Sequence, residues 1–179
     1  MTGVQPCALP ISVTLVTNST LILRDLDILA ELATLGLVQV SVSVTTLNNG
    51  LKTALEPRTA GPRARLRVLD SLHQARVPVG AMIAPVIPCI NDNELEDIVA
   101  AVSKAGASTV GYILLRLPLE VEDLFVEWLQ QHYPNRADHV MSHLRAMRGG
   151  VASRAEGGSR MRGPGTLADL LARPMARAP

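Results

Sequence analysis

Hydroxyl and amide side chains gather where apolar runs of this sequence end. Asn18 and Ser19 follow the run "VTLVT", and Ser41, Ser43 and Thr45 alternate with valines in "VQVSVSVT". These groups donate and accept hydrogen bonds, but none is a strong acid, base or nucleophile without an activating partner. The set therefore favours a site for a polar small molecule, and no catalytic residue is assigned. For each residue alone, a turn or cap hydrogen bond is the competing interpretation.

Arg58 is the candidate for holding an anionic group of such a ligand. It lies in "LEPRT", shortly after the second of these apolar runs. A guanidinium can bind a carboxylate or a phosphate through two parallel hydrogen bonds. The alternatives are an ion pair with Glu56 and a contact at the entry of the next helix.

The cysteine and histidine pattern predicts no metal site. His139 and His143 lie four residues apart on an expected helix, which is a spacing that can bind a metal ion, but no third ligand is evident. Exposed histidines are the favoured interpretation. Cys89 lacks a basic neighbour that would lower its pKa, so we expect a loop residue between a strand and a helix, without a His or Lys partner. The sequence also has no glycine-rich phosphate loop and no nucleophile elbow.

A repeated order of helix, short link and β-rich run organises the chain. It occurs as "LATLGLVQVSVSV", "LHQARVPVGAMIA" and "VSKAGASTVGYILL". Because helices and strands then alternate, we expect an α/β fold of parallel strands with outer helices. Strands are expected near 13–17, 38–45, 78–84 and 109–116, and helices near 20–35, 62–75, 92–105 and 120–132. Parallel strands bring their carboxyl ends to one edge, where ligands bind in such folds.

Helix-boundary signals agree with this division. Gly36 and Gly106 stand where a glycine should end a helix, and Pro62 suits a first helical turn. Either Asn91 or Asp92 is expected to cap the helix that follows the third strand.

The second strand predicts which way its side chains point. In "VQVSVSVT" the valines share one face, and Gln39, Ser41, Ser43 and Thr45 share the other. In a sheet built from βα units the valines should pack under helices, and the hydroxyls should face a barrel interior, where a polar ligand would satisfy them. A solvated face of an antiparallel sheet is the alternative.

Composition and charge bound the remaining classes. Of the 179 residues, 47% are hydrophobic and 2% aromatic, which predicts an aliphatic core. Two cysteines make no disulfide framework, so a reducing, cytoplasmic location is expected. No apolar run reaches the length of a membrane span. Residues 136–179 contain 8 arginines against 3 acidic residues, and an alternative function is therefore a non-catalytic module that binds nucleic acid through this Arg-rich tail.

Several ordered strings resemble one known family. The segments "VTNSTLILRDLDILAEL", "SVTTL", "EPR", "APVIPCIND", "LRLPLEV" and "RMRG" resemble the radical S-adenosylmethionine (radical SAM) proteins related to spore photoproduct lyase, from about residue 13 to about residue 172. The resemblance implies an incomplete six-stranded (βα) barrel. In this barrel S-adenosylmethionine lies beside a [4Fe–4S] cluster and yields a 5′-deoxyadenosyl radical, which takes a hydrogen atom from a substrate.

The resemblance also implies site residues and shows departures from the family. Ser19, Ser43 and Arg58 are its candidate contacts to S-adenosylmethionine, and Ser41 and Thr45 share the face of Ser43 in our interpretation. Relatives usually carry a lysine where this chain has Asn18, which brings no charge. The C-x-x-x-C-x-x-C motif that holds the cluster occurs nowhere in the sequence, and clusters need thiolate ligands.

Three segments follow from these observations. The chain is expected to begin at the family's third strand, with the partial barrel over residues 13–148 and a flexible basic tail over 149–179. Residues 1–12, "MTGVQPCALPIS", resemble a translated sequencing adapter and are interpreted as non-native, with a genuine disordered terminus as the alternative. Without the cluster motif, this chain is expected to be inactive alone.

Overall fold

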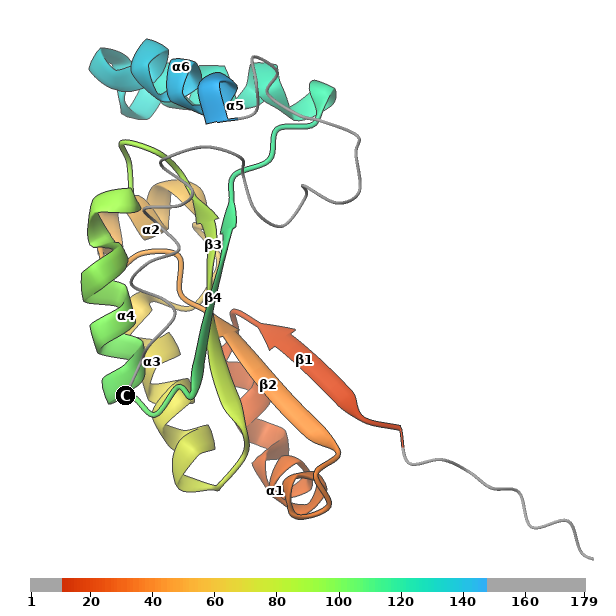
Figure 1. Cartoon of the computed structure of the whole chain (residues 1–179). Coiled ribbons are helices and arrows are strands. Elements are labelled where there is room, and N and C mark those ends of the chain that lie inside the picture. Colours follow the sequence, from red (N-terminus) through yellow and green to blue (C-terminus); the bar gives the residue numbers. More distant parts are fainter. Residues whose placement is uncertain (1–10, 148–179) are drawn as a thin grey trace, which may run out of the picture.

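The computed structural model describes residues 11–147, and the predictions for most of the N-terminal segment and for the tail lie outside that range. Strands and helices alternate along the chain (Figure 1). The elements are β1 (Val13–Thr17), η1 (Thr20–Asp25), α1 (Leu26–Thr34), β2 (Val38–Ser43), α2 (Asn49–Leu55), α3 (Pro62–Gln74), β3 (Val79–Val86), η2 (Asp92–Glu94), α4 (Leu95–Lys104), β4 (Thr109–Leu114), α5 (Leu119–His132), η3 (Pro134–Arg136) and α6 (Ala137–Met147).

The four strands form one parallel sheet in the order β1-β2-β3-β4. Each strand therefore pairs with the next one along the chain, as expected when every connection crosses back through a helix. The expected α/β fold with parallel strands is confirmed. β1 is an edge strand, and Val16 on it is 64% exposed.

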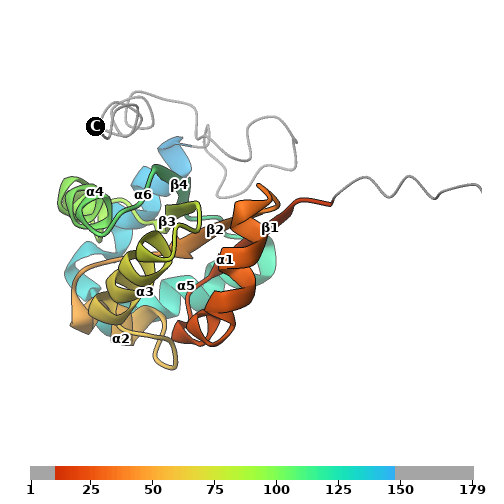
Figure 2. The same ribbon diagram turned by 90° about the horizontal axis from the view of Figure 1, so that it is seen from below.

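Helices α1, α3 and α4 cover one face of the sheet (Figure 2). The valines of β2 and its extension pack there against leucines and isoleucines of these helices, and Val40, Val42 and Val44 are at most 1% exposed. Full burial of such a side chain stabilises the fold by about 1.5–3 kcal/mol. The valine face of the second strand is therefore confirmed as the helix-packed face.

The opposite face of the sheet, which we call the serine face, carries Ser41 and Ser43. In register with them lie Gly80 and Met82 of β3, and Thr109 and Gly111 of β4 continue the same two rows. Both serines are half-buried. The sheet thus has one aliphatic side under helices and a second side that is partly polar around β2.

Helices α5 and α6 lie beyond the carboxyl ends of the strands (Figure 1). They enclose a second apolar cluster with the loop after β3, which contributes Ile87 and Ile90. Leu129 of α5 and Val140 of α6 are fully buried in it. This cluster fixes the helical pair above the edge of the sheet where the candidate site residues lie.

Two glycines end helices as expected, and they provide a matched test of packing. Gly36 and Gly106 have φ angles of +67° and +93°, and a Cβ at Gly106 would lie 2.3 Å from Cγ of His73, whereas a Cβ at Gly36 meets nothing within 4 Å. We expect Gly36→Ala to cost about 1 kcal/mol through backbone strain alone. Gly106→Ala should cost about 2–4 kcal/mol, because overpacking adds to strain.

Urea unfolding of the two glycine variants measures this difference directly. Equal losses of stability would show that the contact with His73 relaxes without cost.

Candidate functional site

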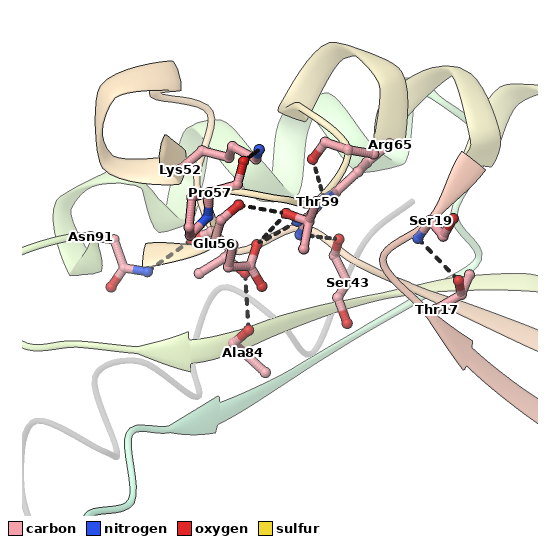
Figure 3. Close-up of polar contacts among 12 residues, drawn as sticks. Thr17, Ser19, Ser43, Lys52, Glu56, Pro57, Thr59, Arg65, Ala84 and Asn91 are labelled. Carbon is pink, nitrogen blue, oxygen red and sulfur yellow. Dashed lines mark hydrogen bonds and ion pairs between the residues drawn. The ribbon is translucent and has the colours of Figure 1, made fainter. Parts of the chain in front are cut away.

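The end of β1 is a helix cap. The backbone N–H of Ser19 donates to Oγ1 of Thr17 at 3.1 Å, and Oγ of Ser19 accepts from the N–H of Leu21 at 3.1 Å (Figure 3). The competing cap interpretation is therefore correct for the oxygen of Ser19, while its hydroxyl proton has no acceptor among the described residues. Asn18, between Thr17 and Ser19, is half-buried.

The two serines of β2 are placed differently from Ser19. Within residues 11–147 neither the hydroxyl of Ser41 nor that of Ser43 has a hydrogen-bond partner. Neither oxygen is fully buried, so solvent or a bound molecule can reach both hydroxyls. The pair can therefore donate to, and accept from, a ligand on the serine face.

Thr45 lies two residues beyond Ser43, the last residue of β2, and is 3% exposed. Its hydroxyl donates to the carbonyl oxygen of Ala84 on β3 at 3.0 Å. Its proton therefore already links two strand ends. Contact of Thr45 with a ligand stays a prediction, and it would use the lone pairs of the hydroxyl oxygen.

Arg58 is exposed in the loop between α2 and α3. The alternative prediction of an ion pair between Arg58 and Glu56 is wrong, because Glu56 pairs with Arg65. Within the described part of the chain Arg58 has no ion-pair partner. Among the described residues, Arg58 therefore places an unpaired guanidinium in the connection between β2 and α3.

Arg65 is the residue that sequence reasoning missed. Its side chain is 3% exposed, and its guanidinium donates to the carbonyl oxygens of Ala60 and Ser43 at 2.9 and 3.0 Å. It also donates to Oγ1 of Thr59 at 2.7 Å and pairs with the carboxylate of Glu56 (Figure 3). One buried arginine thus fastens the loop of Arg58 to the end of β2.

A sequence signal for Arg65 existed. It falls on the face of α3 that also carries Leu69 and Leu72, at i, i+4 and i+7, and all three are buried. A charged residue in an apolar stripe must be paired when the stripe packs.

The loop after β3 is held by Asn91, which is completely buried. Its Oδ1 accepts from the N–H of Ile87 at 2.7 Å, and its amide donates to the carbonyl oxygens of Thr45 and Pro85 at 2.8 and 3.0 Å. The prediction that Asn91 or Asp92 caps the next helix is therefore wrong, since neither side chain makes a cap bond there. Asn91 instead joins the ends of two neighbouring strands.

Glu94 ties the same loop region to the end of β2. Its carboxylate accepts from the hydroxyl of Thr46 at 2.8 Å and from the N–H of Leu47 at 2.8 Å. Together with Asn91, this carboxylate links the loop after β3 to the segment that follows β2.

Cys89 lies in the loop after β3, as expected, and is half-buried. Burial and the carboxylate of Asp92 raise the pKa of its thiol, while Arg136 acts in the opposite direction. The expectation that it has no histidine neighbour is wrong. Its Sγ and one ring nitrogen from each of His139 and His143 all lie within 4.8 Å of one another.

The described residues do not fit a [4Fe–4S] cluster. The sequence holds two cysteines, and Cys89 has imidazoles rather than thiolates beside it, so this chain cannot supply the thiolate set of a [4Fe–4S] cluster. The serine hydroxyls of β2 do suit the polar groups of a small ligand.

Within residues 11–147, no helix is long and apolar enough to cross a membrane.

Comparisons with known proteins give related sequences. An uncharacterized protein of Mycobacterium tuberculosis is 32% identical over 127 residues, which cover 70% of this chain and 37% of the relative. An uncharacterized protein of Methanocaldococcus jannaschii is 26% identical over 120 residues, covering 67% and 43%. One from Acidianus two-tailed virus is 38% identical over 72 residues, covering 40% and 23%. The chain spans less than half the length of each of these relatives.

A family model adds the assignment that these uncharacterized relatives do not. The model described as the Radical SAM superfamily matches residues 7–102, which is more than half of the chain and includes β1 to β3 with most of α4. The parallel sheet with helices on one face agrees with a part of the barrel of that family. This chain belongs to the radical SAM superfamily.

Proposed function

We propose that this chain is the S-adenosylmethionine-binding part of a longer radical SAM enzyme, with the cofactor lying across the serine face at the carboxyl edge of the sheet. The carrying observation is the pair of half-buried hydroxyls of Ser41 and Ser43, which have no partner within residues 11–147. Because neither oxygen is fully buried, a ligand can reach both hydroxyls, and each hydrogen bond to it would contribute about 0.5–1.5 kcal/mol.

The neighbouring groups support the same ligand. The hydroxyl proton of Ser19 has no acceptor among the described residues, and Arg58 is exposed and without an ion pair there. S-adenosylmethionine carries a carboxylate, which a guanidinium binds well. Since Asn18 brings no charge where relatives usually carry lysine, Arg58 is our candidate for that role. Ser41 and Thr45 complete the proposed set.

With a [4Fe–4S] cluster in the whole enzyme, bound S-adenosylmethionine would supply radical chemistry, and Ser41, Ser43 and Arg58 of this chain would hold it. We infer that the cluster ligands of the whole enzyme come from a segment outside this sequence. The ordered strings "RDLDIL", "SVTTL", "EPR" and "APVIPCIND" support kinship with spore photoproduct lyase. The role of this chain is then to bind and orient the cofactor, and its cysteine usage supports a cytoplasmic location.

Titration of the chain with S-adenosylmethionine in a calorimeter tests the proposal. We expect saturable binding that weakens roughly 30-fold in Ser41→Ala/Ser43→Ala, because two hydrogen bonds of about 1 kcal/mol each are lost. Ser142→Ala is the matched control, since it removes an exposed hydroxyl from α6. Unchanged affinity in the double variant, or no binding by the parent chain, would contradict the proposed site.

A further inference from the structure

Three potential metal ligands from distant parts of the sequence meet above the carboxyl edge of the sheet. Cys89 comes from the loop after β3, and His139 and His143 come from α6. Their sulfur and nitrogen atoms all lie within 4.8 Å of one another. We propose that these three side chains bind one divalent transition-metal ion, with Zn²⁺ as the best match, at a site distinct from the serine face.

The spacing on α6 suits a shared metal ion. Residues four apart lie on one face of a helix, and the two imidazole rings have their centroids 4.4 Å apart. In tetrahedral zinc sites the bonds are about 2.3 Å to sulfur and 2.0–2.1 Å to nitrogen, which sets neighbouring ligand atoms roughly 3.4–3.6 Å apart. The three side chains therefore need to approach by roughly 1 Å, a distance that rotamer changes of partly exposed side chains supply.

The ligand atoms are free to move into this geometry. His139 is exposed and His143 is half-buried, and neither ring has a hydrogen-bond partner among residues 11–147. The backbone of Cys89 is fixed, because its carbonyl oxygen accepts from Arg136 at 3.2 Å and the turn around it is closed by the N–H of Asn91 bonding to the carbonyl of Ile87 at 3.2 Å. The backbone of Cys89 is thus hydrogen-bonded, and two imidazoles without hydrogen-bond partners among the described residues lie beside its thiol.

The donor set selects the ion. One thiolate and two imidazoles suit zinc, and also cobalt or nickel in the same coordination, whereas calcium and magnesium prefer oxygen. Three protein ligands leave a fourth position for water or a further group. A single thiolate cannot hold an iron–sulfur cluster, so the three side chains suit a single metal ion.

A metal ion here would connect α6 to the loop after β3. That loop is also tied to β2 through Asn91, so the ion would fasten the helical pair to the edge of the sheet. Because the ion binds the folded chain, it should raise the thermal midpoint by an amount that grows with the logarithm of the free metal concentration above Kd.

Cobalt titration of the full chain tests the site. In a Cys7→Ser background Cys89 is the sole thiol, so we expect one Co²⁺ per chain, with the visible bands of tetrahedral cobalt and a thiolate charge-transfer band. Cys89→Ser should abolish the charge-transfer band. His139→Ala and His143→Ala should each weaken binding by at least the roughly 10- to 100-fold that follows loss of an outer-shell partner.

His73→Gln is the matched control, because His73 lies on α3 and not on the elements that carry Cys89, His139 and His143. This variant should leave cobalt affinity unchanged. Zn²⁺ should raise the thermal midpoint of the Cys7→Ser chain and not that of Cys7→Ser/His139→Ala/His143→Ala. The proposal would be overturned if the parent did not bind cobalt stoichiometrically. It would also be overturned if the Cys89 and histidine variants bound cobalt as tightly as the parent does.

Discussion

Arg65→Ala should lose about 3–5 kcal/mol of unfolding free energy, the typical cost of removing one partner of a buried ion pair. The variant leaves the carboxylate of Glu56 without its arginine and the carbonyl oxygen of Ser43 without its side-chain donor. A typical domain is stable by about 5–15 kcal/mol, so this one change removes a large part of the total. The loop of Arg58 should also detach from the end of β2.

Urea unfolding followed by circular dichroism measures the Arg65 effect. Arg63→Ala is the matched control, because Arg63 is exposed two residues earlier on the same helix and its loss should change stability by less than about 0.5 kcal/mol. Equal stability of the two variants would mean that the buried network contributes nothing to the fold.

The second large effect is a complete absence of cluster chemistry in this chain. After anaerobic reconstitution with iron and sulfide we expect no broad iron–sulfur absorbance, and no 5′-deoxyadenosine from S-adenosylmethionine under a strong reductant. The reason is ligand number, because the sequence holds Cys7 and Cys89 as its two cysteines and a [4Fe–4S] cluster needs more thiolate ligands than two.

The matched control for cluster assembly is Cys7→Ser/Cys89→Ser, which should behave as the parent does in both assays. Cluster absorbance and 5′-deoxyadenosine in the parent, lost together in the double variant, would show that two cysteines suffice here.

Much of the fold follows from local patterns in the sequence. The alternation of valine and serine in β2 requires two unlike faces, and the structure places the valines in the core and the serines opposite. Gly36 and Gly106 end helices because both adopt positive φ. Such signals depend on neighbours within a few residues, which is why strand and helix positions could be predicted closely.

The polar ties of the site depend on distant residues and could not be predicted in this way. Asn91 is of a residue type that is favoured at helix N-caps, yet its amide donates to the carbonyl oxygen of Thr45, which lies 46 residues away. Cys89 and His143 come together only through the packing of α5 and α6 against the loop after β3. The short helix α2 was also missed, because no helix was predicted between the strand near 38–45 and the helix near 62–75.

Hydrogen–deuterium exchange with and without S-adenosylmethionine tests the central claim most directly, because it locates the ligand on the chain. We expect slower exchange in peptides that cover the strand ends at residues 17–21 and 41–46 and the loop of Arg58, with α6 unchanged. Protection confined to residues 137–147, or no protection at the strand ends at saturating ligand, would contradict binding on the serine face.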